Sequence, residues 1–341
     1  MPPQPAPGMW DKIKSWFSQN ATKYTLEFLP ETNAVPLPAY AGYVRLWLVE
    51  GYLAQSRNWG ANQFPAMQGG VTLNFLGSQP TTFSALSRPD TTWTTPGVRV
   101  DFPMTPLIPF NGGVVEVEAA LYRAATDGPL GIAVTLLGGL ASLFGPPLAG
   151  AAAIADKVSS GLGLIAGNDT PVLGLHWSAI AEGGNGNLLT PGYLIAATAP
   201  GGRVTSVGGK LVVTTAQGQQ PIESYDYLVL RIECRTERDD WRFPDLDALI
   251  RTAGQAFIQG EQSLFTAKRT EAIARAWNSA DLTPMDRKRV ALLVKGELDG
   301  LGELGLLRGP RRTIDAIAQQ HLVDPADPEL DGLKLEHLLS G

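Results

Sequence analysis

The segment YLVLRIECRTERDDWRFPDLDALI, residues 227–250, contains the change of sequence pattern that decides the fold. Its first third alternates apolar and polar side chains with a period of two, which is typical of a half-buried β-strand. One face of this strand would hold Leu228, Leu230, Ile232 and Cys234. From Phe243 onward, apolar residues recur every three or four positions, which is typical of an amphipathic helix. The segment therefore predicts an α+β protein whose chain changes from strands to helices near residue 244.

Upstream of this segment, short runs rich in β-branched and aromatic residues alternate with clusters of Gly, Pro and Asn, as in all-β domains. They predict nine strands in two sheets, over residues 24–29, 43–54, 70–76, 98–102, 114–124, 173–181, 192–198, 210–215 and 227–236. In the strand over 114–124, the face with Glu116 and Glu118 is expected to meet water or a partner, so antiparallel sheets are favoured. Segments 58–69, 78–97 and 182–192 are expected to be long loops, which often form binding surfaces.

Downstream, the sequence predicts helices with marked starts. Thr283 is a suitable N-cap, Pro284 suits the first helical position, and Asp286 suits the positive end of the helix dipole. This helix should run from Pro284 to Leu298, and another should start at Thr313. The fold class is therefore α+β, mainly β: a flexible Pro-rich start with a short amphipathic helix over 1–21, an antiparallel β-sandwich over 22–244, and an all-α module over 245–341.

The most unusual segment is an apolar insert in the predicted sandwich. The 28 residues between Asp127 and Asp156 carry no formal charge, which is enough to cross about 30 Å of hydrocarbon. Gly145-Pro146-Pro147 interrupts it, however, so two helices joined as a hairpin over 129–167 are expected. Two interpretations stay open: the hairpin packs on the sandwich, or it enters a membrane or a partner. The candidate contacts are Leu130, Leu137, Leu140 and Phe144.

The N-terminal segment has a related pattern. Trp10, Ile13, Trp16 and Phe17 would share one face of a short helix that also carries lysines, a composition suited to a membrane interface. The alternative is a helix docked on its own domain or on a neighbouring subunit. These four residues are therefore candidate membrane or partner contacts.

The composition restricts which classes of partner and which cellular compartment are expected. With 27 Lys plus Arg against 33 Asp plus Glu, the net charge is −6, so a nucleic-acid partner is not expected. The single Cys234 cannot form an internal disulfide, and the N-terminus lacks the pattern of a secretory signal. A cytoplasmic protein is expected, with peripheral membrane association if the apolar segments bind lipid. The preference for Arg over Lys and the many Ala and Gly residues are common in bacterial proteins.

No motif predicts catalysis, a cofactor or a metal site. The three histidines and one cysteine include no pair with zinc-ligand spacing. Residues 300–305 match the letters of a dinucleotide motif, but they follow a predicted helix rather than a strand, so they indicate a helix end and a linker. The acidic residues between Glu237 and Asp247 alternate with arginines that should neutralise them. Candidate contacts for an anion or a partner are Arg308, Arg311 and Arg312 at a helix start.

These observations favour a non-catalytic protein-binding or assembly protein that uses its loops and its helical tail. Its expected partners are other protein subunits or further copies of itself. The alternative is a membrane-active effector or pore-forming protein that inserts the hairpin 129–167. An enzyme of unknown type is the third interpretation, because carboxylates far apart in sequence can meet on a sheet without leaving a motif.

Overall fold

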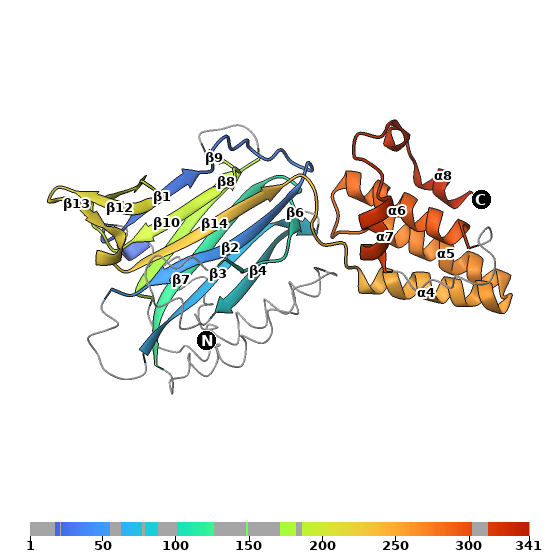
Figure 1. The fold of residues 1–341 in the computed structure, drawn as a ribbon, viewed down its shortest axis with the longest axis horizontal. Coiled ribbons are helices and arrows are strands. Elements are labelled where there is room, and N and C mark those ends of the chain that lie inside the picture. The colour runs from blue at the N-terminus through green and yellow to red at the C-terminus, as the bar shows by residue number, and fades with distance from the viewer. Residues whose placement is uncertain are drawn as a thin grey trace, which may run out of the picture. The chain divides into compact units, whose positions relative to one another are not determined.

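The computed structural model describes residues 18–20, 22–54, 63–76, 79–87, 101–125, 148, 171–181, 186–301 and 313–340. The chain divides into two compact units. The first unit comprises Met1–Phe144 and Ala151–Arg235, and the second comprises Gly145–Gly150 and Thr236–Gly341. Antiparallel sheets occupy the described part of the first unit and helices that of the second (Figure 1). The predicted α+β class is confirmed.

The first sheet has the strand order β1–β10–β14–β2–β5, and β6 pairs with β2. Its strands are β1 (Thr25–Pro30), β2 (Tyr43–Tyr52), β5 (Phe102–Pro103), β6 (Ile108–Pro109), β10 (Gly192–Ala197) and β14 (Tyr227–Arg235). As the alternation in β14 predicts, Leu228, Leu230 and Ile232 are fully buried. Cys234, at the end of the same row, is half-buried. The opposite row, which starts with Tyr227, Val229 and Arg231, forms what we call the outer face of the first sheet.

The second sheet has the order β4–β3–β7–β8–β9. Its strands are β3 (Gln63–Leu76), β4 (Gln79–Ser87), β7 (Val114–Ala125), β8 (Leu173–Ile180) and β9 (Asn187–Leu188). All its pairs are antiparallel except the short parallel pair β8–β9. The second sheet contacts the inner face of the first, where the ring of Phe28 stacks on that of Trp177 with 5.2 Å between centroids.

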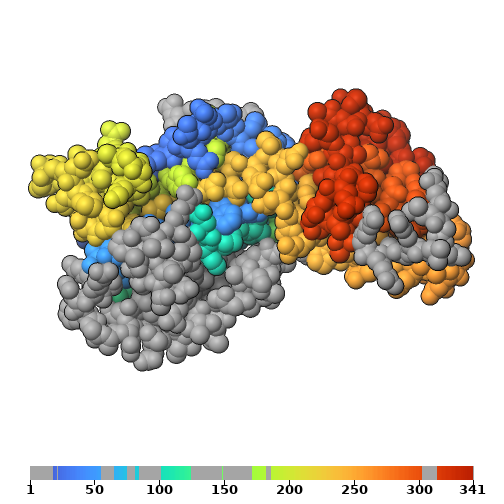
Figure 2. Space-filling model, in the orientation of Figure 1, coloured from blue at the N-terminus to red at the C-terminus, as the bar shows by residue number. Residues whose placement is uncertain are grey.

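A third, small sheet consists of β11 (Arg203–Val207), β12 (Lys210–Thr215) and β13 (Gly218–Pro221), followed by the 3₁₀ turn η4 (Ile222–Ser224). Gly208 and Gly209 connect β11 to β12 with φ of 58° and 79°. Both central residues of a type I′ turn need positive φ, which glycine adopts without a steric penalty. The sequence Gly-Gly-Lys therefore forms the hairpin turn between β11 and β12. Figure 2 shows this small sheet as a yellow lobe beside the blue strands of the first unit.

The structure corrects two predictions about the strands. The segments 58–69 and 78–97 were expected to be loops, but β3 starts at Gln63 and β4 spans 79–87. Within the described residues, β4 pairs with β3 alone, and the hydroxyls of Thr72 and Thr82 meet across the pair at 2.8 Å. The second correction concerns β7: on the face expected to meet water, Glu118 and Tyr122 are 3% and 2% exposed, whereas Glu116 is half-buried. Both faces of its middle are therefore interior.

The second unit contains α4 (Pro244–Gln259), α5 (Gln262–Trp277), α6 (Pro284–Asp299), α7 (Ile314–His321), the 3₁₀ turn η5 (Pro328–Leu330) and α8 (Leu335–Leu339). Their apolar faces share one core, which includes Trp241 and Phe243 from the segment before α4. The two predicted helix starts are confirmed. The side chains of Thr283 and Thr313 accept hydrogen bonds from the backbone N–H groups of Asp286 and Ala316, which satisfies N–H groups that a helix start leaves free.

Candidate functional site

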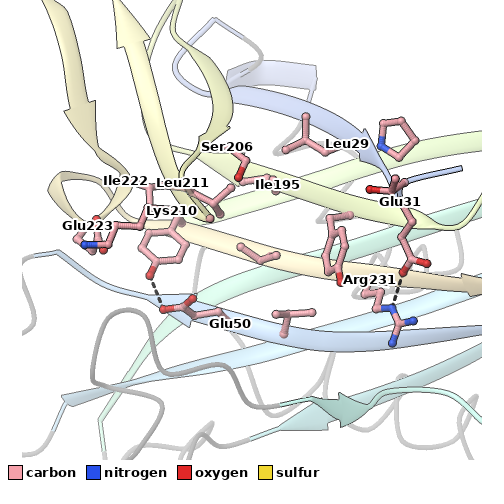
Figure 3. A pocket seen from close by; sticks show the side chains of 17 residues that line it. Leu29, Glu31, Glu50, Ile195, Ser206, Lys210, Leu211, Ile222, Glu223 and Arg231 are labelled. Atoms are coloured by element: carbon pink, nitrogen blue, oxygen red, sulfur yellow. Dashed lines mark hydrogen bonds and ion pairs between the residues drawn. The ribbon is translucent and has the colours of Figure 1, made fainter. Parts of the chain in front are cut away.

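A groove of about 1100 Å³ lies on the first unit. Its floor is the outer face of the first sheet, with residues from β1, β2, β10 and β14. Its other side comes from β11, β12 and η4 (Figure 3). This volume is slightly above the range of roughly 300–1,000 Å³ that is typical of small-molecule sites. We refer to it as the sheet groove.

The middle of the sheet groove is apolar. Val49, Ile195 and Val229 contribute to its floor and belong to a buried cluster with Tyr52 and Ile222. Val229 and Ile195 reach this face because alternate residues of β14 and β10 point to opposite sides. Val49 reaches it through an irregularity in pairing: Val229 pairs with Glu50 and Leu230 with Leu48, so β2 has one extra residue. This β-bulge presents both Val49 and Glu50 to the groove.

One end of the groove is built around Tyr227. Its hydroxyl donates a hydrogen bond of 2.5 Å to Oε1 of Glu50. Burial, this bond and the negative charges of Glu50 and Glu223 together raise the pKa of Tyr227 above its usual value. The phenol therefore keeps its proton and acts as a donor, which holds the Glu50 carboxylate in place. The carboxylates of Glu50 and Glu223 make this end attractive to a cation, although the exposed Lys210 also lines the groove.

The opposite end carries an ion pair. Nε of Arg231 donates to Oε1 of Glu31 over 2.8 Å, and the two side chains are 27% and 30% exposed. Figure 3 shows the dashed contact of Glu50 and the dashed contact between Arg231 and Glu31 at opposite ends of the groove. Partial exposure weakens such a pair, so its main effect is to orient both side chains. The groove thus offers fixed polar groups on either side of an apolar patch.

The polar row continues along the outer face beyond the groove. Glu233 accepts a hydrogen bond of 2.6 Å from Nε1 of Trp47. It also lies 3.6 Å from the guanidinium groups of Arg45 and Arg235. Arg45 lies over the Trp47 ring, 5.2 Å from its centroid. Because charged and aromatic side chains are paired here, this part of the face forms a polar surface next to the sheet groove.

The groove is suited to binding. Its described lining includes the side chains of Ser206, Thr32 and three glutamates as acceptors, and of Lys210 and Arg231 as cations. Among the described residues, no group of three or more His, Cys, Asp or Glu side chains is arranged to hold a metal ion. His176 contacts Glu118 in the second sheet, with 3.1 Å between Nδ1 and Oε1, whereas Cys234 lies in the first sheet. These two residues are on strands of different sheets.

Each candidate contact residue predicted from the sequence lies outside the described residues. This holds for Trp10, Ile13, Trp16 and Phe17, for Leu130, Leu137, Leu140 and Phe144, and for Arg308, Arg311 and Arg312. None of the helices within the described ranges is both long and apolar enough to cross a membrane.

The acidic residues near 237–247 do meet arginines. Oδ2 of Asp245 lies 2.6 Å from Nη2 of Arg275, and Oδ1 of Asp240 lies 3.5 Å from Nε of Arg242. Oε1 of Glu237 lies 3.8 Å from Nη2 of Arg289. Two of these arginines come from helices α5 and α6, not from the acidic segment itself. The neutralisation that the sequence predicted is therefore partly provided by distant residues.

Sequence reasoning missed the sheet groove. The alternation in β14 places Val229 and Arg231 on the face opposite the core, and this was the available signal. The sequence contains no signal that β11, β12 and η4 would stand beside this face. Comparisons with known proteins add no assignment, since neither a protein-family model nor a curated protein matches the chain.

Proposed function

We propose that this chain is a non-catalytic binding or assembly protein, and that the sheet groove holds a segment of a protein partner. The observation that carries the proposal is the combination of an apolar floor at Val49, Ile195 and Val229 with oriented polar groups at both ends. Protein interfaces typically have an apolar centre and a polar rim. A partner subunit or a second copy of the chain would supply the segment.

The proposal also includes how the sheets and the helices are arranged within each unit. We take the two large sheets to form a β-sandwich, supported by the stacking of Phe28 on Trp177 between them. We take α4 to α8 to form a C-terminal all-α module, supported by their shared core. In this arrangement the sandwich is a rigid support for the sheet groove, and the helices provide a further docking surface. Rigid support keeps the polar groups of a site in place for binding.

The chemistry of the groove suggests which partner segment fits. An apolar side chain would be buried on the floor, which is worth about 1.5–3 kcal/mol for a Val, Leu or Phe. A Lys or Arg nearby in the partner would meet Glu50 and Glu223 at the Tyr227 end. The proposal therefore specifies an extended segment with an apolar residue and a basic residue.

Cross-linking tests this proposal directly. A photoreactive amino acid at Leu211, which is half-buried and lines the groove, should cross-link to a partner or to a second copy. The matched control is Val207 on the same hairpin, which is 54% exposed and does not line the groove. Leu211→Glu should abolish capture of that partner, whereas Val207→Glu should preserve it. Equal capture by both variants would contradict a role for the groove.

The membrane-active alternative depends on residues 129–167, of which the structure describes Leu148. The membrane-active alternative rests on the sequence pattern. The third interpretation, an enzyme of unknown type, also rests on the sequence. The binding proposal includes a cytoplasmic location, and the membrane-active alternative would add peripheral membrane association. Vesicle flotation distinguishes the binding protein from the membrane-active protein.

A further inference from the structure

The uncharged stretch between Asp127 and Asp156 has a described residue, Leu148, which belongs to the helical unit. Residues Gly145–Gly150 group with Thr236–Gly341, whereas the chain before and after them groups with the first unit. Leu148 has no solvent exposure. Its backbone N–H donates a hydrogen bond of 2.9 Å to Oδ1 of Asp281, a residue 133 positions away. Leu148 is therefore bound within the helical unit.

Asp281 is an unusual acceptor for this bond. It lies between α5 and α6 and is 2% exposed. Its backbone is fixed on both sides: its N–H donates to Oγ of Ser279 over 3.3 Å, and its carbonyl accepts from Nη1 of Arg238 over 2.9 Å. Within the described structure, its second carboxylate oxygen, Oδ2, is buried and has no hydrogen-bond partner. Within the described structure, the hydrogen bond of this buried carboxylate is therefore the one that its Oδ1 accepts from the Leu148 N–H.

The charges around Asp281 only partly compensate its burial. Arg275 of α5 and Arg238, which precedes α4, favour the carboxylate, whereas Asp245 of α4 opposes it. Burial is the largest influence, and it raises the pKa of Asp281 above the usual value. A buried carboxylate that is incompletely hydrogen-bonded is costly to keep. The N–H of the buried Leu148 requires an acceptor, and Asp281 supplies it.

We propose that Asp281 is the anchor that holds Leu148 in the helical unit, and that loss of this hydrogen bond exposes Leu148 to water. The contact is intramolecular and its two partners are the Leu148 N–H and Asp281 Oδ1. It keeps the Leu148 side chain from water until the anchor is broken. The proposal is independent of the sheet groove, because all the residues of the anchor belong to the second unit.

Hydrogen exchange at the Leu148 amide tests the anchor in the full-length protein. Asp281→Ala should speed exchange on the order of tenfold or more, because it removes the acceptor. Asp281→Asn should leave exchange as slow as in the original chain, because its amide oxygen still accepts the bond. Asp299→Ala is the matched control: it breaks an ion pair with the buried Arg269 in the same unit and should not change exchange at Leu148.

Unchanged exchange at Leu148 in a folded Asp281→Ala protein would overturn the proposal, as would an equal increase in Asp299→Ala. Helical circular dichroism establishes that each variant is folded. A second measurement covers an Asp281→Ala protein that does not fold. In a Cys234→Ala background, a thiol introduced by Leu148→Cys should react at least tenfold more slowly than one introduced by Val207→Cys. Equal reaction rates would show that residue 148 is not held, and would overturn the proposal.

Discussion

At the scale of single residues, the hydrogen bond from Tyr227 to Glu50 is the feature that organises the sheet groove. Tyr227→Phe leaves the ring in place but removes the donor from a partly buried carboxylate. We expect the free energy of unfolding of the first unit to fall by about 1–2 kcal/mol, as measured by urea denaturation. Tyr225→Phe is the control, because the Tyr225 hydroxyl donates to exposed Gln220. An equal loss in both variants would show that the buried bond has no special role.

A second residue-scale prediction concerns the pH dependence of stability. The pKa of Asp281 is raised in the folded chain, so the folded state binds this proton more tightly than the unfolded state. Its contribution is fully present below the unfolded pKa of 3.8 and is lost as pH rises through the folded pKa. Asp281→Asn has no ionisable group at this position, so the variant does not lose this stability as the pH rises.

Urea unfolding, followed by the helical signal, measures this contribution. The stability difference between Asp281→Asn and the original chain should move in favour of the variant from pH 3 to pH 7. Comparing the two proteins at each pH cancels the contributions of other groups, such as Asp247 and Asp299, whose pKa values shift in opposite directions. A difference that moves the other way with pH would show that the Asp281 carboxylate is stabilised in its charged form.

At the scale of elements, two glycines with open space around them should respond in opposite ways to alanine. Gly209 lies in the β11–β12 turn with φ of 79°, whereas Gly296 lies in the interior of α6. A Cβ at either position would meet no atom within 4 Å. Gly209→Ala should cost about 1–2 kcal/mol because of its left-handed backbone. Gly296→Ala should stabilise α6 by roughly 0.5–1 kcal/mol.

Thermal unfolding with strand and helix signals recorded separately would measure both effects. The strand signal should melt earlier in Gly209→Ala, and the helix signal should melt later in Gly296→Ala. A destabilising Gly296→Ala would mean that α6 is less regular at that residue than the structure shows. Because the β11–β12 turn borders the sheet groove, Gly209→Ala should also reduce cross-linking from Leu211.

At the scale of the whole molecule, flotation with lipid vesicles separates the binding protein from the membrane-active alternative. The original chain should remain unbound, because Leu148 is buried in the helical unit. Asp281→Ala should float with the vesicles, because loss of the anchor exposes Leu148, which lies in a sequence of 28 uncharged residues. Asp299→Ala is again the control and should remain unbound. Flotation of the original chain to the same extent as Asp281→Ala would favour the membrane-active alternative.

The features that the sequence determined by itself are those that depend on interactions between residues close together in the chain. The row Leu228, Leu230 and Ile232 is buried because alternate side chains of a strand share a face. The N-cap at Thr283 and the turn at Gly208 and Gly209 satisfy backbone requirements within a few residues. In each case the energy that selects the structure comes from residues close in sequence, so the pattern alone was sufficient.

Only the tertiary structure decided the remaining features, because their energies come from segments that are far apart in the chain. Strand β4 is polar and forms through pairing with β3. The bond from Tyr227 to Glu50 joins residues 177 positions apart, and the bond from Leu148 to Asp281 joins residues 133 positions apart. A buried polar group must find a partner, but which partner it finds depends on how distant strands and helices pack. The sheet groove and the Asp281 anchor are therefore properties of the folded chain and not of any local sequence pattern.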